Sequence, residues 1–150
     1  ITAHCALEIA AAALGTTFRE TPTLIIGWGR IGKCLAAQLS GLGCGLTVAA
    51  RSAKDRAMLA ALGRKAVDIP EIPGVLTGIR LLINTVPVPI LDGEILAKYP
   101  KCVKLDLASA PGLVGTGVIC ARGLPGRYAP ESSGRLIAET ILRKLKEAAI

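Results

Sequence analysis

The sequence has few aromatic residues, one histidine and no long uncharged apolar run, and each shortage excludes a class of protein. Aromatic residues make up only 3% of the 150 residues, which argues against the stacking surfaces that bind single-stranded nucleic acid. His4 is the single histidine, so a His-centred triad or a His-rich metal site cannot be assembled. Because no run of about 18 apolar residues is free of charge, we expect no membrane span and no secretion signal, and hence a cytoplasmic protein.

Neither the cysteines nor the charged residues form a cluster. The cysteines are odd in number, widely spaced and without a CxxC pair, which favours reduced thiols over disulfides or a zinc site. We therefore expect small, mostly buried apolar side chains at Cys5, Cys34, Cys44, Cys102 and Cys120. The formal net charge of +7 comes from scattered Lys and Arg residues, so it favours solvated surface and a phosphate-bearing small molecule over nucleic acid.

The sequence does contain many aliphatic residues in alternating helix and strand patterns. Apolar residues make up 51% of the chain with few aromatics among them, the composition of parallel strands covered on both faces. The periodicity predicts an α/β Rossmann fold, a doubly wound parallel sheet of about six strands with helices on both faces. The expected strands cover 23–26, 46–50, 66–69, 81–84, 103–107 and 118–121, and the expected helices cover 2–14, 31–42, 53–62 and 131–148.

The two ends of the chain carry further expectations. The chain starts at Ile1 without a methionine and passes at once into a helix, for which Thr2 is the expected N-cap. We therefore expect a single domain over residues 1–150 that is a fragment of a longer protein. Near the other end, glycines and prolines predict a loop over 123–134, ahead of an amphipathic helix.

A GxGxxG pattern lies between the first expected strand and the helix that follows it. In that context the first glycine permits a tight turn, the second lets the backbone approach a pyrophosphate, and the third lets helix and strand pack closely. The free amides of the helix N-terminus would then face the anion. The expected cofactor-binding residues are Gly27, Trp28, Gly29, Arg30, Ile31 and Gly32. The alternative is a glycine turn without a ligand.

The residue after the second expected strand indicates which nicotinamide cofactor is bound. An NAD enzyme places Asp or Glu there to accept hydrogen bonds from the ribose hydroxyls, whereas this chain has Arg51 followed by Ser52. A guanidinium can pair with a 2′-phosphate in a bidentate manner, with help from Ser52, Lys54 or Arg56, so we expect NADP(H). The alternative is that Arg51 points into solvent.

Polar residues also lie at the C-terminal ends of the fourth and fifth expected strands, at the edge where open α/β sheets bind their ligands. We expect this edge to face the nicotinamide half of the cofactor, through Asn84, Thr85, Val86, Pro87, Asp106 and Ala108. Ser109 shares the edge. The alternative is ordinary turn chemistry, for which Asn, Asp, Ser and Pro are equally suited. No residue stands out as catalytic, so the cofactor is expected to supply most of the chemistry.

Five segments in a fixed order resemble a known family. They are GWGRIGK, TVAARS, INTVP, LDLAS followed by Pro111-Gly112, and GLPGRYAPESSG. Over nearly its whole length the chain resembles the C-terminal half of the dipicolinate synthase A subunit family. GxGxxG and NTxP are also shared with D-2-hydroxyacid dehydrogenases, so the other segments make the resemblance specific. The chain differs from the family at His4-Cys5, where members often have an acidic residue and glycine, and at 131–133, where they have Lys-Thr-Ala.

The resemblance implies a function and a set of partners. It implies a sporulation enzyme that oxidises dihydrodipicolinate, or a related cyclic dicarboxylate of the lysine pathway, to dipicolinate. An upstream substrate-binding domain would complete the site, a flavoprotein-like second subunit would be a partner, and a homo-oligomer is expected. By the same resemblance, the residues that close over the substrate would be Arg127, Ser132, Ser133 and Gly134.

Two other functions are compatible with the same residues. A D-2-hydroxyacid or keto-acid reductase would use the same cofactor loop on a different carboxylic acid. A regulatory domain could bind NADP(H) to sense it, without turnover. Hydride transfer by the full-length protein would distinguish the two enzymes from the sensor. A nucleic-acid-binding module is a more distant alternative, which a salt-dependent shift of DNA would be needed to support.

Overall fold

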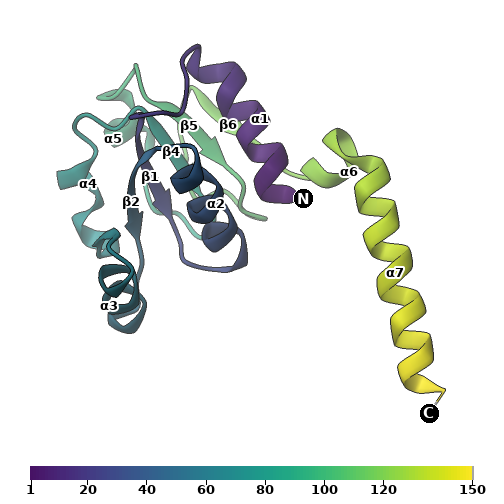
Figure 1. Ribbon diagram of the computed structural model, residues 1–150. Helices are drawn as coiled ribbons and strands as arrows, with labels where there is room; N and C mark the ends of the chain where they lie inside the picture. The colour runs from purple at the N-terminus through teal and green to yellow at the C-terminus, as the bar shows by residue number, and fades with distance from the viewer. Residues whose placement is uncertain (150) are drawn as a thin grey trace.

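The computed structural model describes residues 1–149, which form a six-stranded, all-parallel sheet with helices on both faces (Figure 1). The strands lie in the order β3-β2-β1-β4-β5-β6, so the direction of winding reverses between β1 and β4. Their bounds are β1 Pro22–Ile26, β2 Gly45–Ala49, β3 Lys65–Val67, β4 Leu81–Asn84, β5 Val103–Asp106 and β6 Val118–Cys120. The predicted doubly wound α/β fold is confirmed.

Seven α-helices and one 3-10 turn connect and flank these strands. Their bounds are α1 Thr2–Leu14, α2 Arg30–Gly41, α3 Ala53–Ala61, η1 Ile69–Glu71, α4 Ile72–Val75, α5 Gly93–Ala97, α6 Leu124–Tyr128 and α7 Pro130–Ala148. Helices α1 and α2 cover one face of the sheet, and α4 and α5 lie against the other. No helix in the described part is both long and apolar enough to cross a membrane.

The central strands are apolar along their whole length because both of their faces are buried. Successive side chains of a strand point to opposite faces. Thus Ile25 and Ile83 pack with the apolar residues of α1 and α2, whereas Leu24, Ile26 and Leu82 pack with those of α4 and α5. Each such side chain contributes about 1.5–3 kcal/mol when it is fully buried. The two cores together hold β1 and β4 at the centre of the sheet.

Three local predictions are wrong. Thr2 is the first helical residue rather than the cap, since Ile1 occupies the cap position without a side-chain bond. The third strand ends at Val67, because Asp68 accepts from the Ile69 amide and Glu71 accepts from the Asp68 amide, and this capping box starts η1. Residues 123–134 form α6 and the first turn of α7, because proline suits the first turn of a helix.

Helix α7 extends away from the sheet (Figure 1) and leaves its apolar side exposed. It packs mainly against α6. The sequence correctly predicts an amphipathic helix here, but none of its apolar side chains is buried by residues 1–149. Each is more than half exposed, with fractions from 54% to 62% at Leu136, Ile137, Ile141, Leu142 and Leu145.

The cysteines are all free, but only some of them are buried as predicted. Cys5 and Cys102 are buried and Cys44 is half-buried, whereas Cys34 and Cys120 are exposed. Burial raises the pKa of the Cys44 and Cys102 thiols, although a hydrogen bond with Thr23 partly opposes the shift at Cys44. Both thiols therefore remain protonated at neutral pH.

A buried carboxylate organises the ends of β4 and β5. Asp106 is fully buried, and its Oδ1 accepts from Asn84 Nδ2 at 2.8 Å and from the Ala108 amide at 3.1 Å. Its Oδ2 accepts from the amides of Gly112 and Leu113 at 2.8 and 3.0 Å. One side chain thus ties the loop after β5 to the end of β4.

We predict that Asp106→Leu destabilises the protein by about 4 kcal/mol, because it leaves three backbone amides buried without acceptors. Chemical denaturation of the variant and the unmodified protein measures this loss. Asp92→Ala is the control, since it removes an exposed aspartate that accepts only the Ile95 amide, and should cost about 1 kcal/mol. Equal losses in the two variants would contradict the assignment.

Candidate nucleotide-binding site

The glycine loop lies at the switch point of the sheet, between the carboxyl ends of β1, β2 and β4. Gly27 has φ of +103°, and its amide donates to the Ala49 carbonyl at 2.9 Å. A Cβ at Gly27 would collide with the Thr85 hydroxyl, and one at Gly32 would collide with the Gly27 carbonyl oxygen. A Cβ at Gly29 would meet no protein atom within 4 Å. Two glycines therefore let the chain pack tightly, and the third leaves the backbone open to a ligand.

Two clefts border this loop. The β2 cleft has a volume of about 770 Å³ and lies beside the ends of β2 and β3. Its lining residues are Gly27, Trp28, Gly29, Ala50, Arg51, Ser52, Asp55, Asp68, Ile69, Pro70, Val86, Pro87, Val88 and Ile90.

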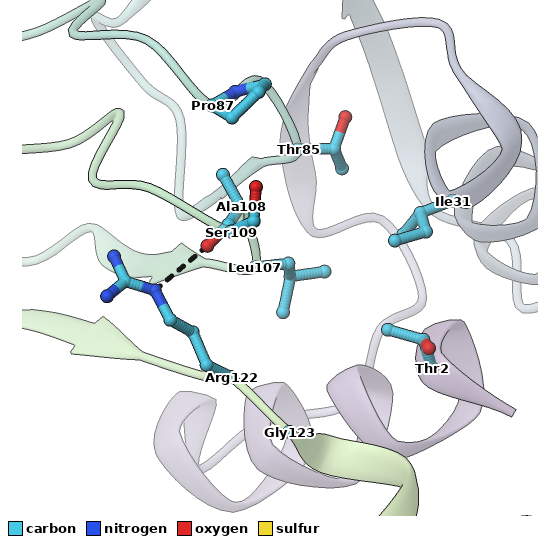
Figure 2. A pocket seen from close by; sticks show the side chains of 9 residues that line it. All are labelled: Thr2, Ile31, Thr85, Pro87, Leu107, Ala108, Ser109, Arg122 and Gly123. Atoms are coloured by element: carbon cyan, nitrogen blue, oxygen red, sulfur yellow. Dashed lines mark hydrogen bonds between the residues drawn. The ribbon is translucent and has the colours of Figure 1, made fainter.

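The β5 cleft has a volume of about 530 Å³ and lies on the other side of β4 (Figure 2). Its lining residues are Thr2, Ile31, Thr85, Pro87, Leu107, Ala108, Ser109, Arg122 and Gly123. Pro87 borders both clefts, so they meet at the carboxyl end of β4. The N-terminus of α2 opens between them, and its free amides suit an anion. The arrangement fits a dinucleotide that spans both clefts with its pyrophosphate at the loop.

Arg56 holds the end of β2 against the end of β3. Its Nη1 donates to the carbonyls of Ala50 and Arg51 at 2.7 and 2.8 Å, and its Nη2 lies 3.1 Å from Asp68 Oδ2. We call these contacts the Arg56 bridge. Arg56 is therefore occupied by protein groups and is not the additional phosphate ligand that the sequence allowed. The bridge also partly neutralises Asp68, a carboxylate that lines the β2 cleft.

Arg51 and Ser52 lie at the cleft as the sequence predicts. Arg51 is exposed there, and its carbonyl, rather than its side chain, makes the contact with Arg56. Ser52 is the N-cap of α3, where its Oγ accepts from the Asp55 amide at 3.3 Å. The Ser52 oxygen accepts this bond through a lone pair, so the Ser52 hydroxyl can still donate its proton to a ligand oxygen.

The structure brings most of the predicted cofactor residues to the clefts. These are Gly27, Trp28, Gly29, Ile31, Arg51, Ser52, Thr85, Val86, Pro87 and Ala108. Arg30 and Gly32 belong to the first turn of α2 and line neither cleft. Asn84 and Asp106 correct the prediction, because they are fully buried and bonded to each other. They shape the edge of the sheet rather than face a ligand.

The residues predicted to close over a substrate lie away from both clefts. Arg127 is in α6, with its guanidinium 5.8 Å from the ring of Tyr128. Ser132, Ser133 and Gly134 lie within α7, where Ser133 Oγ donates to the Ala129 carbonyl at 2.8 Å. Within residues 1–149 they therefore have no contact with the site.

Sequence reasoning missed Arg122, which lines the β5 cleft. Its Nε donates to the Ala108 carbonyl at 3.0 Å. Ligands bind at the carboxyl ends of strands, and Arg122 lies just beyond the carboxyl end of β6, so the position of that strand end in the sequence is the signal for this residue. Residues 1–149 hold no cluster of three or more His, Cys, Asp or Glu side chains suited to a metal ion.

No family model matches the chain. It is 31% identical to the dipicolinate synthase A subunit of Bacillus subtilis (strain 168) in an alignment 140 residues long, which covers 87% of this chain and 47% of that protein. The crystal structure of the B. subtilis dipicolinate synthase A subunit superposes with a TM-score of 0.90 at 30% identity, covering 97% of this chain and 52% of that one. The resemblance to the dipicolinate synthase A subunit is confirmed.

The chain spans about half the length of the dipicolinate synthase relatives that it matches. The nucleotide-binding domain of glutamyl-tRNA reductase from Thermoplasma volcanium shares the fold alone, with a TM-score of 0.61 and 20% identity over 93% of this chain and 96% of that one. The shared fold, the glycine loop and its two clefts are together typical of a Rossmann-type nucleotide-binding domain.

We predict that Gly29→Val leaves the fold intact but weakens NADPH or NADH binding at least tenfold, about 1.4 kcal/mol. The added side chain meets no protein atom but fills the space that a pyrophosphate would need. Thermal unfolding with and without dinucleotide measures both effects. Gly32→Ala is the matched comparison and should lower the melting temperature itself, since its Cβ overlaps the Gly27 carbonyl oxygen. Undiminished stabilisation of Gly29→Val by dinucleotide would contradict the role of the loop.

Proposed function

We propose that this chain is the NADP(H)-binding domain of an oxidoreductase that forms dipicolinate from a dihydro cyclic dicarboxylate. The observation that carries the proposal is the pair of clefts on either side of the glycine loop, with Arg51 at the end of β2. The relationship to the dipicolinate synthase A subunit supplies the substrate class. The proposal extends to its setting, a cytoplasmic, sporulation-linked homo-oligomer that works with a flavoprotein-like second subunit.

The two clefts would each hold one half of the cofactor. The adenosine half belongs in the β2 cleft, where Ile69 and Pro70 offer an apolar wall and Arg51 and Ser52 face the ribose. The nicotinamide half belongs in the β5 cleft, between Ile31 of α2 and Leu107 after β5. When bound, NADP⁺ supplies the hydride acceptor, and the substrate loses one hydride and one proton as its ring becomes aromatic.

Arg51 supports NADP(H) over NAD(H). Two carboxylates, Asp55 and Asp68, also line the β2 cleft and would oppose a 2′-phosphate. Asp68 is paired with Arg56, so its opposition is reduced. The guanidinium of Arg51 is exposed and can form two parallel hydrogen bonds with a phosphate. The balance of these charges favours the phosphorylated cofactor.

The described residues of the β5 cleft include no acidic or imidazole side chain to receive the proton. The residues lining the β5 cleft in the described chain include three hydroxyls and one guanidinium, but no carboxylate and no imidazole. The relatives are about twice as long, and the apolar side of α7 is left exposed. These observations support a further, substrate-binding half that packs against α7 and brings the proton acceptor, and the resemblance implies that this half is the upstream one.

We predict that NADPH binds at least tenfold more tightly than NADH, a difference of about 1.4 kcal/mol, and that Arg51→Asp reverses the order. Calorimetry with both cofactors measures the ratio. Lys101→Asp is the control, because it makes the same change of charge at an exposed residue that lines neither cleft. Equal affinities in the unmodified protein, or equal effects of the two substitutions, would remove the role given to Arg51.

We predict that residues 1–150 bind NADPH but turn nothing over, whereas the full-length protein with its second subunit forms dipicolinate. The assay supplies dihydrodipicolinate and NADP⁺ and follows the ultraviolet absorbance of dipicolinate. Reduction of a simple 2-keto acid by NADPH, with no dipicolinate formed, would instead identify a keto-acid or 2-hydroxyacid reductase. NADPH binding without any hydride transfer by the full-length protein would identify a sensor domain.

A further inference from the structure

Arg122 is placed to bind an anion in the β5 cleft. Strand β6 ends at Cys120, the next residue Ala121 is buried, and the side chain of Arg122 then extends across the end of β5. In Figure 2 the exposed side chain of Arg122 lies at the rim of the cleft, across from Ile31 and Thr2, with its terminal nitrogens pointing outward. This part of the cleft is the farthest from α2. The substrate, rather than the pyrophosphate, would therefore lie there.

The guanidinium is oriented, but its hydrogen-bonding capacity is not used up. Nε donates to the Ala108 carbonyl at 3.0 Å, and that bond fixes the plane of the group against the loop that Asp106 organises. The two terminal nitrogens have no hydrogen bond or ion pair with any residue in 1–149. A guanidinium held by Nε presents its terminal N–H groups as a pair, the geometry that binds a carboxylate in a bidentate manner.

The rest of the cleft makes the choice of ligand specific. Among its described lining residues Arg122 is the only charged one, and the hydroxyls of Thr2, Thr85 and Ser109 are the other polar side-chain groups. Leu107 and Pro87 offer an apolar surface between them. A small, flat carboxylic acid matches this lining, with its anionic group at Arg122 and its carbon skeleton over the apolar residues.

We propose that Arg122 anchors one carboxylate of the substrate beside the nicotinamide half of the cofactor. The proposal rests on the proposed function for the position of the cofactor. Arg127, which the resemblance implies would close over the substrate, lies on α6 against Tyr128 and lines neither cleft in the described chain. Arg122 thus determines the charge of the acid that the site accepts.

The test uses the full-length protein with three variants, Arg122→Gln, Arg122→Lys and Arg127→Gln. Arg122→Gln should raise the KM for the carboxylate substrate at least tenfold and leave the Kd for NADPH within twofold. Arg122→Lys should raise this KM less than Arg122→Gln does, because lysine keeps the positive charge but cannot form the bidentate pair. Arg127→Gln removes the same charge outside the clefts and should change neither constant. A KM shift below twofold in Arg122→Gln, or an equal shift in Arg127→Gln, would overturn the proposal.

A binding experiment tests the role of Arg122 without depending on turnover. Calorimetry with pyridine-2,6-dicarboxylate in the presence of NADP⁺ should show at least tenfold weaker binding to Arg122→Gln, while thermal unfolding confirms that the variant is folded. If Arg122→Gln does not fold, Arg122→Lys must still weaken binding, and unchanged binding there refutes the proposal. A protein that reduces 2-keto acids with a KM that depends on Arg122 refutes the dipicolinate function but supports the anchor. A protein that forms dipicolinate with a KM that does not depend on Arg122 supports the dipicolinate function and refutes the anchor.

Discussion

The buried carboxylate of Asp106 is the interaction on which the geometry of both clefts depends. A carboxylate buried without a cation is costly unless hydrogen bonds replace its water, and here Asn84 and three backbone amides do so. The same bonds set the path of the loop after β5. That loop carries Ala108, whose carbonyl orients Arg122, and Gly112, where a Cβ would collide with the Asn84 side chain. The loop that borders the β5 cleft is thus held in place by one buried side chain.

The glycine loop complements this network on the other side of β4. Gly27 and Gly32 allow the backbone of the loop, the start of α2 and Thr85 to approach more closely than side chains would permit. Thr85 in turn donates to the Ile26 carbonyl at 2.9 Å, which joins the end of β1 to the chain leaving β4. The site therefore consists mainly of backbone held rigidly at strand ends, with few side chains responsible for selectivity.

The sequence predicts those parts of the molecule that depend on local pattern. Strand β4 is predicted residue for residue because four buried residues end at a polar turn, and the glycine loop is predicted because its strand and helix flank it. The segment 123–134 is misread because proline and glycine are frequent both in loops and in the first turns of helices. Asn84 and Asp106 show a deeper limit, since the same residue types at a sheet edge can bind a ligand or each other. Only the three-dimensional positions of their partners decide between the two.

The Arg56 bridge has a consequence for how such a domain can diverge. It holds the chain at residues 50 and 51 through their carbonyl oxygens, which every amino acid possesses, and through the separate carboxylate of Asp68. The backbone that presents residue 51 is therefore insensitive to which side chain is presented. Descendants of this protein could exchange one nucleotide for another by a single codon change at that position, with the supporting scaffold inherited unaltered.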